Sequence, residues 1–236
     1  NNGGMYIEGE PNIEGNQATF YSFEAFWRQL EFSVWNLEHE YVHYLDGRFV
    51  KYGGFGHFPD SLVWWTEGIA EYISKKFDNP KAVALLKDTP VDEWPTLTDI
   101  FSTTYADGTD RVYRWSYLAQ RFIFGFHKQQ GQALANFLKD NDFRGYKSAL
   151  STYAKNHQSA FNTWLKSLLA HEEINNESSE SSESNEGNKA SNNTEQSIDE
   201  NSINKPKYLY RYLYRDYLRP SHLPITPKHQ HYSNWG

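Results

Sequence analysis

The chain has 236 residues, a formal net charge of −7 and an aromatic content of 17%, so it can bury a sizeable core. It has no cysteine, which excludes disulfides, thiolate zinc ligands and a cysteine nucleophile. No run of about 18 apolar residues is present, so we expect no membrane-spanning helix.

The first third of the chain predicts one strand and two long helices. Met5 and Ile7 alternate with other residues between glycines, which predicts a strand over 5–10. Ser22 is expected to cap a helix over 23–32 that continues through 34–49, where apolar residues recur at helical spacing. A glycine-rich loop follows. Pro59 then begins a second helix, which runs through 61–77.

The remainder predicts further helices and then a change of composition. The helices are expected over 91–102, 110–130, 132–140, 145–156 and 160–172. The segment 172–205 holds nine acidic residues and two lysines but few apolar side chains, which predicts a disordered acidic linker. A calcium-binding or regulatory role is the alternative for that segment. The tail, 206–236, is basic and rich in tyrosine, and its role is unassigned.

A short motif, His39-Glu40-Tyr41-Val42-His43, carries the chemistry. On a helix, positions i and i+4 share one face, so both imidazoles can reach one ion at the ~2.1 Å that zinc requires. Glu40 then lies beside the metal, where it can take a proton from a zinc-bound water. The alternative interpretation is a pair of histidines that only pack or face solvent.

A second motif, WWTEGIAEY, supplies the context that the first one needs. Catalytic zinc usually has three protein ligands and one open position. Glu67 follows His43 by 24 residues and lies on the next predicted helix. Glu71, one turn later, could accept the free ring N–H of a ligand histidine. Gly68 permits a close backbone approach between the two helices. The alternative interpretation of Glu67 and Glu71 is a solvated pair that binds no metal.

These two motifs predict peptide hydrolysis. Zinc lowers the pKa of its bound water toward ~7, and Glu40 passes the water's proton to the leaving amine. The oxyanion needs a further donor, for which Tyr105, Tyr113 and the remaining histidines stay open. His57 lies in the loop between the motifs, where it could line the cleft.

The same residues resemble one family. HEYVHYLDGRF followed by WWTEGIAEY resembles the microbial collagenases of Vibrio and clostridial type, the Vibrio type more closely. NNGGMYIEGE resembles the segment that precedes the active-site helix in that family. The similarity extends from Asn1 to about Glu172 in the family's order, and it is specific because three motifs agree.

The resemblance implies a fold and a division of the chain. The fold is α+β, with a thermolysin-like zinc peptidase core that is mainly helical here, a remnant edge strand at the N-terminus and a helical helper subdomain. We therefore expect an N-terminally truncated catalytic zinc subdomain over 1–105 and the helper over 106–171. The linker 172–205 and the tail 206–236 follow.

The resemblance also implies roles for single residues. Glu67 would be the third metal ligand, and Glu71 would support a ligand histidine. Gly4 would belong to an edge strand that pairs with extended substrate. Glu8 would lie near a structural calcium, with carbonyls after Gly47. Tyr113 would face the transition state.

The expected enzyme is a secreted, monomeric zinc metalloendopeptidase that acts on collagen, gelatin or peptides containing Gly-X-Y. The chain has no initial Met or leader, so we expect a fragment without its signal peptide, and we see no activator domain. Collagen buries its glycines at a crowded axis, so gelatin and short peptides should be the better substrates. A zinc peptidase of other specificity and an inactive zinc- or collagen-binding fragment are the alternatives. We expect neither a membrane nor a nucleic-acid partner, since the tail has no recognised nucleic-acid motif.

Overall fold

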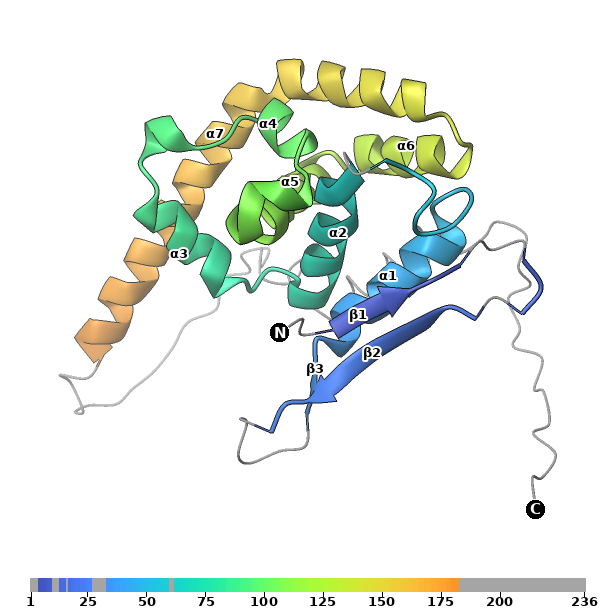
Figure 1. Ribbon diagram of the computed structural model, residues 1–236. Helices are drawn as coiled ribbons and strands as arrows, with labels where there is room; N and C mark the ends of the chain where they lie inside the picture. The colour runs from blue at the N-terminus through green and yellow to red at the C-terminus, as the bar shows by residue number, and fades with distance from the viewer. Residues whose placement is uncertain (1–3, 10–12, 16, 27–32, 60–61, 183–236) are drawn as a thin grey trace, which may run out of the picture.

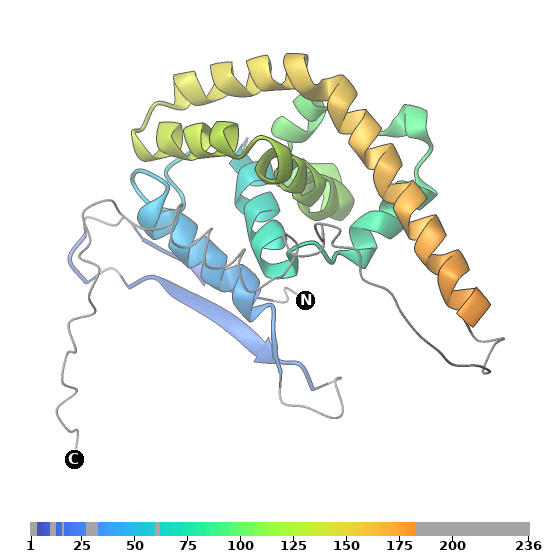
Figure 2. The ribbon, with the colours of Figure 1, turned by 180° about the vertical axis from the view of Figure 1, so that it is seen from behind.

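The protein, represented by a computed structural model, is described over residues 4–9, 13–15, 17–26, 33–59 and 62–182. A small antiparallel sheet lies along one side of helix α1, and the other helices lie beyond α2 (Figures 1 and 2). The expected α+β class with a helical majority is confirmed. Within the described helices, none has the length and hydropathy that crossing a bilayer would need.

Three strands form the sheet in the order β1-β2-β3: β1 (Gly4–Ile7), β2 (Thr19–Glu24) and β3 (Val34–Trp35). The strand expected over 5–10 is present as β1. The helix expected over 23–32 is wrong at its start, because Phe23 and Glu24 belong to β2, while 27–32 lie outside the described residues. Aromatic side chains favour a pleated surface, and pairing with β1 outweighs a serine that only resembles a helix cap.

Helix α1 (Leu37–Phe49) carries the first motif and α2 (Val63–Lys75) carries the second. The expected continuous helix over 34–49 is wrong at its start, where β3 ends and Asn36 turns the chain with φ 59°. Asparagine tolerates this left-handed conformation better than most residues do. The turn separates strand from helix within one residue.

The rest of the described chain is helical. In order its elements are α3 (Pro80–Asp88), η2 (Val91–Glu93), α4 (Leu97–Phe101), η3 (Tyr105–Asp107), η4 (Asp110–Trp115), α5 (Ser116–Phe126), α6 (Lys128–Lys139) and α7 (Phe143–Ser182). Helix α3 was missed, although Asn79 accepts a hydrogen bond from Ala82 N and Pro80 occupies the first turn, which is a standard helix start.

Several predicted helix boundaries are wrong. The helix expected over 91–102 is divided into η2 and α4, because Pro95 interrupts it and Thr96 caps a new helix. The helix expected over 110–130 begins with a π-helical turn and ends before His127, and α6 already starts at Lys128. Conversely, the two helices expected over 145–156 and 160–172 are one helix, α7, which continues past residue 172 to Ser182.

The core is centred on α2, which is apolar around most of its circumference and lies among the other helices (Figure 1). Its tryptophans and Tyr72 are almost fully buried. Tyr72 stacks on Phe124 of α5 with ring centroids 5.9 Å apart, and Trp65 contacts Tyr146 of α7 edge-on at 6.2 Å. This helix is therefore fixed from several sides, which matters because Glu67 lies on it.

A buried polar group joins α1 to α2. Asp46 accepts a hydrogen bond from Trp65 Nε1 at 3.1 Å and pairs with Lys51 Nζ at 2.9 Å. The same Lys51 Nζ donates to Thr66 Oγ1 at 2.7 Å. Separating the partners of a buried ion pair leaves an uncompensated charge, which is strongly unfavourable. These contacts therefore resist any movement of one motif-bearing helix relative to the other.

The close approach of α2 to α5 at Gly68 gives a test of this packing. A Cβ added there would lie 2.8 Å from the Ser116 carbonyl oxygen and 2.9 Å from Ser116 Cβ. We expect Gly68→Ala to lower the free energy of unfolding by about 1–3 kcal/mol, measured by urea denaturation. The matched control is Gly125→Ala in α5, where no atom lies within 4 Å and the substitution should be neutral or stabilising. Equal effects at both positions would contradict the packing described here.

Candidate metal centre

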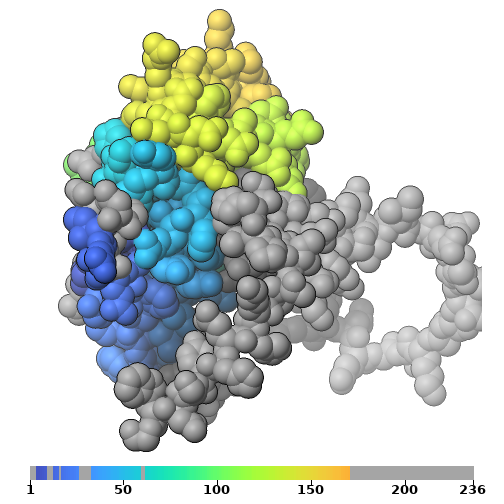
Figure 3. Space-filling model, turned by 90° about the vertical axis from the view of Figure 1, so that its right-hand side faces the viewer, coloured from blue at the N-terminus to red at the C-terminus, as the bar shows by residue number. Residues whose placement is uncertain are grey.

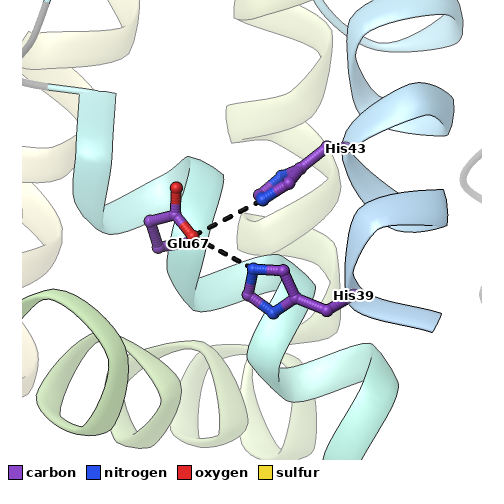
Figure 4. Close-up of side chains that lie close together, drawn as sticks. All are labelled: His39, His43 and Glu67. Atoms are coloured by element: carbon purple, nitrogen blue, oxygen red, sulfur yellow. Dashed lines mark hydrogen bonds and ion pairs between the residues drawn. The ribbon is translucent and has the colours of Figure 1, made fainter. Parts of the chain in front are cut away.

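Three buried side chains converge between α1 and α2 (Figure 4). Glu67 Oε2 lies 3.1 Å from His39 Nε2 and 3.5 Å from His43 Nε2. In the described part of the chain this is the one group of three or more potential metal ligands whose donor atoms lie within 4.8 Å of one another. The structure thus brings together the three residues predicted as ligands.

The donor atoms suit a tetrahedral ion. Ligands bound at ~2.1 Å with tetrahedral angles stand ~3.4 Å apart, close to the two measured separations. Two imidazoles and one carboxylate form a donor set that catalytic zinc uses, with a fourth position left for water. The residues present therefore fit a zinc ion.

The charges in this cluster are strongly coupled. Burial alone would lower the pKa of His39, but the carboxylates of Glu67 and Glu71 beside its ring outweigh burial and raise the pKa to about 9. Burial would raise the pKa of Glu67, but hydrogen bonds and charge from His39 and His43 hold it well below its usual range. Without a metal, His39 therefore stays protonated at neutral pH, and a bound cation would replace that proton.

Glu71 contacts His39 on the side of the ring opposite Glu67. Its Oε1 lies 3.1 Å from His39 Nδ1, the nitrogen that faces away from Glu67. Asn79 Nδ2 donates to the other Glu71 oxygen at 3.4 Å, while Asn79 Oδ1 caps α3. A carboxylate on the second nitrogen fixes the ring orientation of a metal-binding histidine. Sequence reasoning anticipated Glu71 but missed Asn79, whose signal was the Asn-Pro start of α3.

Glu40 is buried next to strand β1. Its Oε1 accepts a hydrogen bond from Asn36 Nδ2 at 3.0 Å, a contact that sequence reasoning missed. Gly4 lies directly against this carboxylate, since a Cβ on Gly4 would come within 2.7 Å of Glu40 Cδ. The glycine is therefore needed here for close approach, and any side chain on it would displace Glu40.

Two tyrosines approach the centre from the helical part. Tyr105 donates its hydroxyl proton to Glu67 Oε1 at 2.6 Å, leaving Oε2 toward the histidines. Tyr113 lies on the π-helical turn, with its ring 6.1 Å from that of His39. Burial and the nearby carboxylates, Glu67 foremost, raise the pKa of Tyr113 to about 12, so it remains a proton donor at neutral pH.

Two further predicted positions lie away from the ligands. Glu8 accepts a hydrogen bond from Phe55 N at 2.8 Å and lies 3.4 Å from Arg48 Nε. It also faces Gly47, as the resemblance implied, but Arg48 already supplies positive charge, so calcium stays a prediction. His57 faces Asn141 Oδ1 at 2.9 Å, and its measured contacts include none of the three ligands.

The fold is α+β, and it carries a His-His-Glu group that could hold a metal ion. A family model described as collagenase matches residues 1–164, and the chain belongs to this collagenase family of peptidases. The resemblance seen in the sequence is thereby confirmed.

Individual relatives agree with the family. A microbial collagenase of Vibrio alginolyticus is 45% identical over 72% of this chain and 21% of its own length. A second, of Vibrio vulnificus, is 37% identical over 71% of this chain and 20% of its length. Collagenase ColA of Clostridium perfringens is 28% identical over 66% of this chain and 14% of its length. The chain thus spans about a fifth of the Vibrio relatives.

The protonated state of His39 gives a pH-dependent prediction. Because metal binding needs a neutral ring nitrogen, zinc should displace about one proton at pH 7, and its apparent affinity should rise about tenfold per pH unit up to about pH 9. Calorimetry in buffers of different ionisation enthalpy measures the released protons. Glu71→Gln should reduce the release, whereas His57→Gln should not. An affinity independent of pH between 7 and 9 would rule out this charge assignment.

Proposed function

We propose that this chain carries the catalytic centre of a zinc metalloendopeptidase that hydrolyses Gly-X-Y sequences of collagen or gelatin. The observation that supports it most is the convergence of His39, His43 and Glu67 with the Glu40 carboxylate beside an edge strand. Membership of the collagenase family supports the substrate class. The proposal concerns the whole protein. This chain corresponds to about a fifth of the length of its Vibrio relatives.

The residues divide the chemistry between them. A bound Zn²⁺ would supply a polarised water and an electrophile for the scissile carbonyl. Glu40 takes the proton of the attacking water and passes it to the leaving amine, and Asn36 holds one of its oxygens in place. Glu71 and Tyr105 orient His39 and Glu67 from behind.

Strand β1 supplies a place for the substrate backbone. It is at the edge of the described sheet, so it has an unpaired side that can add an extended peptide by main-chain hydrogen bonds. Gly4 places this strand against Glu40 without an intervening side chain. A peptide bound along β1 would therefore run past the general base.

The oxyanion donor is best supplied by Tyr113. Tyr105 already donates its proton to Glu67, whereas the Tyr113 ring lies 6.1 Å from the His39 ring and keeps its proton at neutral pH. A preorganised phenol at this place can stabilise negative charge that develops on the carbonyl oxygen.

The other expectations belong to the same proposal. We propose secretion, a monomeric state and action on peptide chains, with gelatin and short peptides preferred over intact collagen. Calcium is the second candidate ion, held by Glu8 and nearby carbonyls. The division into a catalytic part over 1–105 and a helper over 106–171 is also a proposal. It is supported by Tyr113 of the helper, which contacts His39, and by Tyr105 at the boundary, which contacts Glu67.

Substitution of the base tests the function. We expect Glu40→Gln to lower cleavage of a quenched Gly-X-Y peptide by about 10²–10⁴-fold while zinc binding is retained. The control is Glu38→Gln, an exposed carboxylate in the same helical turn, which should keep full activity. Zinc chelation should abolish cleavage.

The outcomes distinguish a failure of the metal centre from a failure of peptide cleavage. Zinc binding without cleavage would mean that hydrolysis needs parts of the protein outside this chain. A fully active Glu40→Gln variant would refute the assignment of the base, and the absence of bound zinc would refute the centre itself.

Replacing each tyrosine distinguishes their roles. Tyr113→Phe should lower kcat by about 10²–10³-fold and leave zinc affinity unchanged, because it removes only the donor to the oxyanion. Tyr105→Phe should weaken zinc binding by about 10–100-fold, because Glu67 loses the hydrogen bond that orients it. Kinetics and zinc titrations of both variants measure this. If Tyr113→Phe weakened zinc binding and Tyr105→Phe lowered only kcat, the two roles would have to be exchanged.

A further inference from the structure

A second group of imidazoles lies where α5 and α6 meet α7. His127 ends α5 and precedes α6, while Tyr153 and His157 stand one turn apart on α7. The rings of His127 and His157 have centroids 4.2 Å apart at 44°, and Tyr153 lies 4.4 Å from His157. None of these contacts involves a residue of the His39 centre.

One nitrogen of His127 is already occupied. Its Nδ1 lies 2.6 Å from the hydroxyl oxygen of Tyr153, which is itself buried. When Nδ1–H donates to Tyr153, the lone pair of the ring is on Nε2. A hydrogen bond on the far nitrogen is the arrangement that orients metal-binding histidines.

His157 contributes free nitrogens. Among the described residues its contacts are with the rings of His127 and Tyr153, and neither of its nitrogens makes a hydrogen bond there. Burial, and then the neighbouring His157, lower the pKa of His127, so its ring is neutral at neutral pH. A protonated His127 would repel a cation, whereas its neutral ring offers a lone pair.

We propose that His127 and His157 form a second metal site, for a borderline divalent cation such as Zn²⁺, Cu²⁺ or Ni²⁺. Imidazole suits these ions. Two nitrogens bound at ~2.1 Å to one ion are at most ~4.2 Å apart, and rotation of the side chains can bring nitrogens of two rings with centroids 4.2 Å apart within that separation. Within the described chain no third histidine or carboxylate joins the pair, so water completes the coordination and the site is weaker than the His39 centre.

Binding at this site would connect the junction of α5 and α6 to α7. Helix α7 runs over α6 and past α5, and Figure 3 shows α6 and α7 at the end of the molecule remote from β2. The ion would therefore act on the packing of the helical part and not on the chemistry at Glu40. We expect a rise in thermal stability at zinc concentrations above those that fill the first site.

Zinc titration of the full chain tests the proposal. The tail histidines, His222, His229 and His231, are first replaced by glutamine so that they cannot contribute imidazoles. Calorimetry should then find two equivalents, the second at least about tenfold weaker than the first. His127→Gln and His157→Gln should each lose the second equivalent and keep the first, which also shows that the variants are folded.

Two further variants refine the result. Tyr153→Phe should weaken the second equivalent by about tenfold, since His127 loses the partner that fixes its tautomer. His57→Gln is the matched control and should keep both equivalents. With the His39 centre first filled by Zn²⁺, one further equivalent of Cu²⁺ should show nitrogen hyperfine coupling that is lost in His157→Gln. A single equivalent in the parent chain, or a second one that survives both histidine substitutions, would overturn the proposal.

Discussion

The position of α1 relative to α2 is the constraint on which the rest of the structure depends. The ligands come from two helices, so a metal site exists only if Glu67 is held opposite His39 and His43 to within a fraction of an ångström. Asp46 and Lys51 provide this with buried contacts to Trp65 and Thr66, the residues just before Glu67. Any rearrangement that separated Asp46 from Lys51 would leave a buried charge unpaired, which is strongly unfavourable.

The helical part contributes to the same site from the opposite side. Tyr105 restrains one oxygen of Glu67, Asn79 restrains Glu71, and the π-helical turn presents Tyr113. A π-helical turn is wider than an α-helical one and is often found at functional sites. The candidate ligand Glu67 is thus oriented by Tyr105, which lies 38 positions away along the chain. These supports would fix the centre before substrate arrives.

Sequence patterns singled out the three residues that the structure brings together, because the chemistry of a metal site restricts the spacing of its ligands. Two histidines four residues apart and a later glutamate required only that both segments be helical, and α2 is buried along most of its length. The last two residues of β2, Phe23 and Glu24, were mistaken for the start of a helix because their pairing with β3 is not encoded in the local sequence. The left-handed turn at Asn36 and the hydrogen bond of Tyr105 depend on tertiary contacts, which no local periodicity encodes.

The metal centre and the substrate edge depend on different parts of the molecule. The ligands and their supports lie on α1, α2 and the helices that follow, whereas Gly4 lies on a small sheet. On the sheet face opposite buried Tyr6, paired residues Met5 and Tyr21 are about half exposed, at 46% and 51%. Three strands packed against a helix are near the minimum for independent stability, and this sheet has three strands with α1 on one side (Figure 1). The geometry of the candidate ligands can persist while the position of β1 changes, so we expect the proposed zinc binding and peptide hydrolysis to be separable.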